Sequence, residues 1–127
     1  MAAPTIVACL SPPGKSAIAC LGIVGPRGWE IVRTLFRRVK NKPLPEEPNV
    51  LAVYFGSFGD PALGSDEVIL YVRSSSNLEV HCHGGAEVVR LLEATLAARD
   101  VLPVAPQAWA EAVHGSERAA MLDIVTR

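Results

Sequence analysis

The residues best suited to chemistry in this chain form one short run, Glu79 to Gly85, with the sequence Glu-Val-His-Cys-His-Gly-Gly. Side chains two apart in a strand share a face. We therefore predict that Glu79, His81 and His83 line one face of a strand and that Cys82 lies on the other. A carboxylate beside two imidazoles can exchange protons, hold a polar organic ligand or bind a metal ion.

The two glycines that end this run predict a sharp corner before a helix. Gly84 and Gly85 permit a tight turn and a close approach of ligand to the backbone. A helical pattern starts at Ala86. Its N-terminal N–H groups would then lie beside His83, where they favour an anionic group.

A metal site is the first alternative for these residues. His81 and His83 have the spacing of a strand-borne ligand pair. Further ligands are available from Glu79, Cys82, Cys9, Cys20 and His114. We favour hydrogen bonds to backbone or an organic ligand, and so predict no metal; a small metal-dependent hydrolase using the two histidines is the less favoured alternative. The cysteines lie in apolar strand patterns typical of core residues, and we predict no catalytic residue.

Composition limits the class of protein. The chain has 127 residues, of which 50% are hydrophobic and 20% are charged, which fits one globular domain. The net charge of −1 provides no global basic field for nucleic acid. Three cysteines without a secretory signal predict reduced thiols and a cytoplasmic location. No apolar run approaches the ~20 residues that span a membrane.

A short stretch near the N-terminus, Gly14-Lys15-Ser16, resembles the end of a nucleotide-binding P-loop. The P-loop needs a glycine where this chain has Cys9, and Pro12 and Pro13 lack the N–H groups that would cradle phosphate. We therefore predict a plain turn, with GTP not bound by these residues.

The elements that position the central run are predicted from periodicity and turn residues. We expect strands over Thr5–Leu10, Ala17–Val24, Val50–Phe58, Glu67–Arg73 and Leu78–His83, with a short edge strand over Leu102–Val104. We expect helices over Gly28–Val39, Glu87–Arg99, Gln107–Val113 and Glu117–Thr126. This pattern predicts an α+β fold with a mixed or antiparallel sheet and packed helices.

Three motifs give the chain a resemblance to a known family. They are Thr5-Ile6-Val7-Ala8 followed by Ser11-Pro12-Pro13-Gly14-Lys15-Ser16-Ala17-Ile18, then Ile23-Val24-Gly25-Pro26, and the run from Glu79 to Gly85. In order and spacing they resemble the N-terminal domain of the TrmE/MnmE family, the tRNA modification GTPases. The likeness divides the chain into a folate-binding and dimerisation domain over residues 5–104 and a C-terminal helical extension over residues 105–127. The extension is expected to lead into a further helical domain, because its last helix is still in register at Arg127.

The resemblance implies a fold similar to the folate-binding aminomethyltransferases and a tetrahydrofolate derivative, in the 5-formyl or methylene form, as cofactor. It implies a homodimer that is not catalytic alone, meets tRNA only indirectly, and works with an FAD-dependent partner on the wobble uridine. The cofactor-binding residues that it implies are Glu79, His81, His83, Gly84, Gly85 and Arg118. A pterin needs acceptors for its amino and ring N–H groups, and a carboxylate such as Glu79 provides them.

One departure from the family changes this expectation. The family's folate-binding arginine on the second strand aligns with Gly22, and Arg118 is assigned to the last basic position only by counting from Trp109. The alternative is therefore a ligand-free dimerisation or interaction module that keeps the fold.

Overall fold

The structure is a computed structural model that describes residues 3–12 and 17–115. Its strands are β1 Ile6–Cys9, β2 Ile18–Val24, β3 Phe36–Arg38, β4 Val53–Asp60, β5 Gly64–Ser74, β6 Asn77–His83 and β7 Leu102–Pro103. Its helices are α1 Gly28–Leu35, the 3-10 turn η1 Val39–Asn41 and α2 Ala86–Ala97, and residues 106–115 are also helical.

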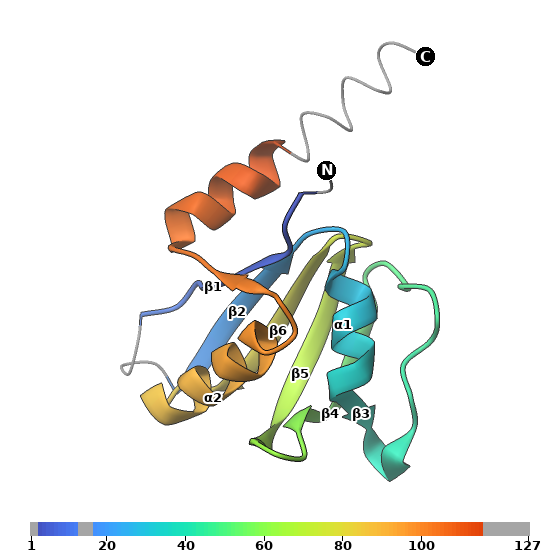
Figure 1. Cartoon of the computed structure of the whole chain (residues 1–127). Coiled ribbons are helices and arrows are strands. Elements are labelled where there is room, and N and C mark those ends of the chain that lie inside the picture. The colour runs from blue at the N-terminus through green and yellow to red at the C-terminus, as the bar shows by residue number, and fades with distance from the viewer. Residues whose placement is uncertain (1–2, 13–16, 116–127) are drawn as a thin grey trace.

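The strands form one sheet in the order β3-β4-β5-β6-β2-β1-β7 (Figure 1). Neighbours are antiparallel except β1 and β7, which are parallel, so the sheet is mixed. The α+β class with a mixed sheet and packed helices is thus confirmed. The run from Glu79 to His83 lies in β6, near the middle of the sheet, between β5 and β2.

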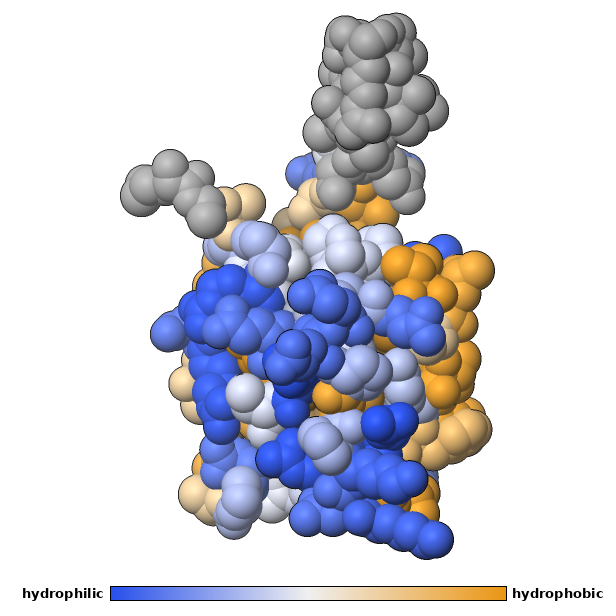
Figure 2. Space-filling view, turned by 90° about the vertical axis from the view of Figure 1, so that its right-hand side faces the viewer, coloured by the Kyte–Doolittle hydropathy of each residue, from blue (hydrophilic) through white to orange (hydrophobic). Residues whose placement is uncertain are grey.

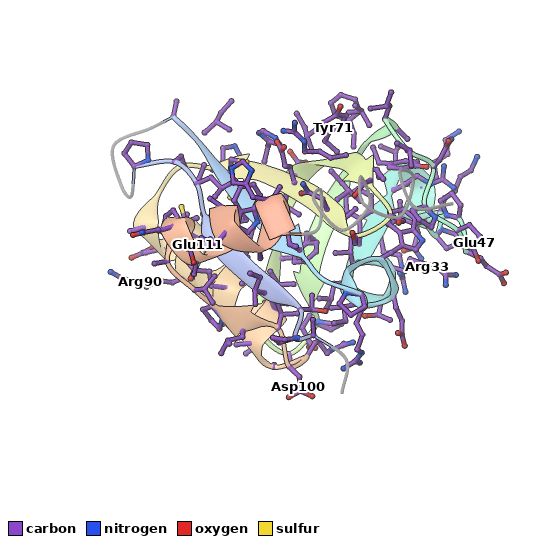
Figure 3. The ribbon with its side chains drawn as sticks, turned by 90° about the horizontal axis from the view of Figure 1, so that it is seen from above. Arg33, Glu47, Tyr71, Arg90, Asp100 and Glu111 are labelled. Carbon is purple, nitrogen blue, oxygen red and sulfur yellow. The ribbon has the colours of Figure 1, made fainter. Side chains whose placement is uncertain are left out.

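Both main helices pack on the same face of the sheet. In Figure 1 α1 and α2 lie in front of the strands, and in Figure 3 Tyr71 points away from the side that the two helices occupy. The helices and the covered face share one core, whose fully buried side chains include Val32, Phe36, Phe58, Leu70, Val72, Leu78, Val80, Leu92 and Leu96. The opposite face of the sheet is not covered by α1 or α2, and it is called the open face below.

The first helix is shorter than predicted. The periodicity predicted a helix to Val39, but α1 ends at Leu35 and Phe36 is extended, with φ −106° and ψ 137°. Phe36 pairs with Phe58 and is fully buried, so the gain from burying this ring in the sheet layer outweighs continuation of the helix. The basic residues Arg37 and Arg38 therefore lie in an edge strand, β3, rather than in a last helical turn.

The β4–β5 hairpin is longer than predicted. β4 begins at Val53 and extends to Asp60, and β5 begins at Gly64, so the turn contains only residues 61–63. The edge strand near residue 102 and the helix near residue 107 are confirmed. The predicted helix over Glu117–Thr126 lies outside the described residues.

No helix in the described ranges is long and apolar enough to cross a lipid bilayer.

Two phenylalanines of β4 provide a test of this two-layer arrangement. Phe58 is 0% exposed and Phe55 is 62% exposed, because they lie on opposite faces of one strand. We expect Phe58→Ala to lower the free energy of unfolding by about 3 to 5 kcal/mol, since it leaves a cavity in the core. The matched control Phe55→Ala should lower it by less than about 1 kcal/mol. Denaturant unfolding at low protein concentration measures both, and equal costs would contradict a sheet covered on one face.

Candidate functional site

The candidate site is built on the open face by two rows of residues that face each other across neighbouring strands. One row runs through Val53, Tyr71, Glu79, Gly22 and Ala8. The next runs through Phe55, Ile69, His81 and Cys20. Directly opposite residues of antiparallel strands point to the same face. The strand register therefore places the side chains of Glu79, His81 and Cys20 together.

Glu79 is the centre of the contacts in this site. Its side chain is only 12% exposed, and Arg73 Nη1 donates a hydrogen bond to its Oε2 at 2.7 Å. His81 Nε2 lies 3.1 Å from Oε1, and the Cys20 thiol donates to the same oxygen at 3.7 Å. The carboxylate is thus fixed by side chains of three strands, β5, β6 and β2.

These contacts shift the ionisation of the site. Burial by itself would raise the pKa of Glu79, but the hydrogen bonds from Arg73 and His81 and the charge of Arg73 outweigh it, so the pKa lies below its usual value. Burial, with the negative charge of Glu79, raises the pKa of Cys20 to about 12. At neutral pH the cluster therefore holds an ionised carboxylate beside a protonated thiol, which is a poor nucleophile.

His83 shares the face of Glu79 and His81 but not their contacts. Its Nδ1 lies 3.0 Å from Asp66 Oδ2, and the hydrogen bond to Asp66 raises the pKa of this exposed histidine. The alternation predicted for this strand is confirmed by burial, since Val80 and Cys82 lie in the core. His81 and His83, however, do not converge as a ligand pair, because the second histidine is held by β5.

The two glycines after β6 lead into α2 as predicted. Gly84 donates its N–H to the carbonyl of Ala17 at 3.0 Å, and Gly85 is the N-cap residue of α2. A side chain at Gly85 would meet nothing within 4 Å, so the space beside it is open. Arg118, the last of the predicted cofactor-binding residues, lies outside the described residues.

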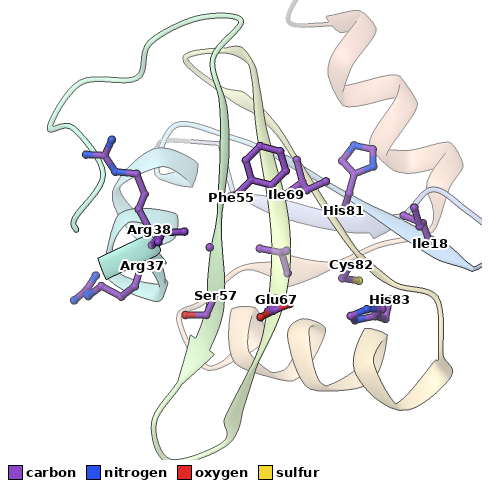
Figure 4. A pocket seen from close by; sticks show the side chains of 13 residues that line it. Ile18, Arg37, Arg38, Phe55, Ser57, Glu67, Ile69, His81, Cys82 and His83 are labelled. Carbon is purple, nitrogen blue, oxygen red and sulfur yellow. The ribbon is translucent and has the colours of Figure 1, made fainter. Parts of the chain in front are cut away.

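A concavity of about 540 Å³ adjoins this cluster on the open face (Figure 4). Phe55, Ile69 and His81 lie side by side along it, and His83 lies lower in the same view. Its lining also includes Ile18, Arg37, Arg38, Val39, Ser57 and Glu67. The arrangement offers an apolar floor with charged groups at the edges, which suits a flat, partly polar ligand.

The position expected for the family's arginine is covered by a tryptophan. A Cβ atom added to Gly22 would lie 2.6 Å from Nε1 and Cε2 of Trp109, which comes from the helical residues 106–115. The indole therefore rests directly on the Gly22 backbone, beside Glu79 in the same row. Among the described residues, Trp109 Nε1 is buried and has no hydrogen-bond partner.

Several residues that shape the site were not predicted as part of it. Cys20 was considered only as one of several ligands, Trp109 was used to place Arg118 but was not assigned to the site, and Arg73 and Asp66 were given no role. Cys20 could have been predicted as part of the site by pairing the predicted strand over Ala17–Val24 with the one over Leu78–His83, because in that pairing it lies opposite His81. Trp109 carried no local signal.

The comparisons with known proteins establish the family of this chain. Residues 5–119 match the family described as GTP-binding protein TrmE N-terminus. The chain is 37% identical over 95 residues to the tRNA modification GTPase MnmE of Thermotoga maritima, and 33% identical over 103 residues to that of Geobacillus thermodenitrificans. These matches cover 69% and 73% of this chain but only 20% and 22% of the relatives. The chain belongs to the TrmE N-terminal domain family, and it spans about a fifth of the length of these relatives.

The contact between Gly22 and Trp109 predicts strong coupling between the two positions. We expect Gly22→Ala to lower the free energy of unfolding by about 1 to 3 kcal/mol, because the new methyl group overpacks against the indole. In a Trp109→Ala background the same change should be neutral or stabilising, since glycine weakens a strand interior. A double-mutant cycle by denaturant unfolding measures the coupling. Additive effects would show that the indole does not rest on Gly22 in solution.

Proposed function

We propose that this chain is the folate-binding and dimerisation domain of a TrmE-like tRNA modification GTPase. The observation that carries the proposal is the fixed carboxylate of Glu79, held on the open face of a TrmE N-terminal domain beside a ligand-sized concavity. In the proposed complex the tetrahydrofolate derivative supplies one carbon, and the residues of this chain bind and orient it.

The residues on the open face are suited to a pterin ring. A carboxylate offers about four lone-pair positions, and Glu79 uses those that face Arg73, His81 and Cys20. These three contacts leave one position on Oε2, and a pterin N–H can replace the weakly donating Cys20 thiol, 3.7 Å away, on Oε1. One position on each oxygen can then receive the amino and ring N–H groups of the pterin. Phe55 and Ile69, both exposed on the neighbouring strands, provide apolar surface for the ring.

The missing arginine weakens this binding rather than abolishing it. Trp109 occupies the position over Gly22 where the family's arginine would lie. Loss of one charged hydrogen bond costs about 1.5 to 3 kcal/mol, which is roughly tenfold to a hundredfold in affinity. The proposed site therefore binds folate more weakly than one that retains the arginine.

Calorimetric titration with 5-formyltetrahydrofolate tests the cofactor. We expect micromolar binding to the chain and loss of at least about tenfold in affinity in Glu79→Gln, because the neutral amide cannot accept both N–H groups. Glu30→Gln is the matched control, since Glu30 is an exposed carboxylate of α1, the helix on the covered face, and the variant should bind as the unmodified chain does. No binding at millimolar ligand would contradict a folate site.

The open face also supports the dimerisation part of the proposal. Val53, Phe55 and Ile18 are 51%, 62% and 60% exposed on it. Figure 2 shows hydrophobic residues gathered along its right-hand edge, the side that α1 and α2 leave uncovered. An apolar face of this kind marks an interaction surface, and in the proposed protein a second copy covers it.

Sedimentation velocity tests the dimer. We expect a dimer for the chain and a monomer for Phe55→Asp, because a charge at the centre of an apolar interface is left without solvent or a partner. Leu63→Asp places the same charge on a hydrophobic residue of the β4–β5 turn, 50% exposed, and should leave the dimer intact. A monomer at all concentrations, or equal effects of the two variants, would contradict this surface.

The packing of Trp109 on Gly22 favours a second candidate function, an interaction module that retains the fold and the dimer without the folate. The two functions differ in the folate titration and agree in sedimentation. In either case, we propose for the whole protein a cytoplasmic location and, with an FAD-dependent partner, modification of the wobble uridine of tRNA. GTP binding is assigned to no residue of this chain.

A further inference from the structure

Three side chains that ligate metals in other proteins converge on the open face. They are Cys20 of β2 and Glu79 and His81 of β6, and their ligand atoms all lie within 4.8 Å of one another. Cys20 Sγ lies 3.9 Å from His81 Nε2 and 3.7 Å from Glu79 Oε1, and the nitrogen lies 3.1 Å from that oxygen. All three belong to strands in the interior of the sheet, so the backbone holds them in place.

We propose that Cys20 Sγ, His81 Nε2 and Glu79 Oε1 bind a divalent transition metal of the zinc type. The inference goes beyond folate binding, shares Glu79 and His81 with the folate site and adds Cys20. It also differs from the His81–His83 pair considered from the sequence, because Glu79 of the same strand and Cys20 of the neighbouring strand take the place of His83.

The separations between the three atoms match the edges of a tetrahedral zinc site. With Zn–S of about 2.3 Å and Zn–N and Zn–O of about 2.0 to 2.1 Å, the edges are about 3.5 Å from sulfur to either other atom and about 3.3 Å from nitrogen to oxygen. The observed separations of 3.9, 3.7 and 3.1 Å are within about 0.4 Å of these values. Shifts of a few tenths of an ångström in the three ligand atoms, which small side-chain rotations allow, would bring them to tetrahedral zinc geometry. The thiol is a weak hydrogen-bond donor, so hydrogen bonding alone explains little of this convergence.

The types of ligand select the metal. A thiolate with an imidazole suits zinc and related transition metals, whereas magnesium and calcium prefer oxygen ligands only. Binding displaces the thiol proton, because the thiolate is the ligand. It also requires the imidazole tautomer of His81 that carries its proton on Nδ1, so that Nε2 offers its lone pair to the metal instead of a proton to Glu79. Three protein ligands leave the fourth position of a tetrahedron for water or another molecule.

Arg73 holds the Glu79 carboxylate through the oxygen that does not face the proposed metal. Arg73 holds Oε2 at 2.7 Å, which fixes the carboxylate and leaves Oε1 toward His81 and Cys20. A charged partner of this kind orients metal-binding carboxylates in general. Glu79 cannot give the same oxygen to a metal and to a pterin, so the metal and the folate are expected to compete.

Cobalt(II) titration of the full 127-residue chain, freed of metal by a chelator, tests the site. We expect equimolar binding with a thiolate-to-cobalt charge-transfer band and the intense visible bands of tetrahedral cobalt, followed by loss of both on addition of zinc. The charge-transfer band should disappear in Cys20→Ser, which keeps a side chain of similar size. The matched control Cys82→Ala removes a cysteine of the covered face and should keep the band. Far-ultraviolet circular dichroism establishes that each variant is folded.

Three results would overturn the site: no charge-transfer band in the chain, a band that persists in Cys20→Ser, or a band lost in a folded Cys82→Ala. The same variants test the folate proposal independently of the metal site. Cys20→Ser should still bind 5-formyltetrahydrofolate, whereas Glu79→Gln loses both ligands. Failure of folate binding leaves the cobalt result unchanged, and the reverse also holds.

Discussion

The antiparallel pairing of β2 with β6 is the constraint on which the rest of the site depends. It sets Cys20 opposite His81 and Gly22 opposite Glu79, so residues from two strands that are far apart in the sequence share one small area of the open face. A slip of one residue would turn every side chain of a strand to the other face. The buried residues Leu21, Ile23, Leu78 and Val80 prevent that slip, because it would move them from the core into solvent. Core packing on one face thus fixes the chemistry of the other.

The division of the sheet into a covered and an open face explains why polar chemistry and apolar surface occur together. The helices α1 and α2 bury one face, and on the other Trp109 covers Gly22 while the strands elsewhere stay exposed. On the open face the ionised Glu79 is stabilised by Arg73, while Phe55 and Val53 on the neighbouring strands are exposed. A carboxylate beside an apolar surface suits a ligand with a polar edge and a flat apolar body, and it also suits a partner that covers the surface.

The sequence predicts local features of this molecule better than features that depend on tertiary pairing. The alternation from Glu79 to His83 and the helix after Gly85 were predicted correctly, because both follow from short-range periodicity and glycine. The end of α1 was not, since Phe36 continues the helical period and only the sheet explains its burial. Cys20 and Arg73 reach Glu79 through strand register, and Trp109 reaches Gly22 from a separate helix. Spacing along the chain contains no information about such contacts.

The register of β2 against β6 is therefore the most direct point at which to test the account. Solution NMR of the labelled chain can detect nuclear Overhauser contacts between backbone protons on adjacent strands. The account predicts contacts between Cys20 and His81 and between Gly22 and Glu79. Contacts displaced by one residue, such as Leu21 with His81, would turn Cys20 away from Glu79 and contradict both the candidate site and its proposed ligands.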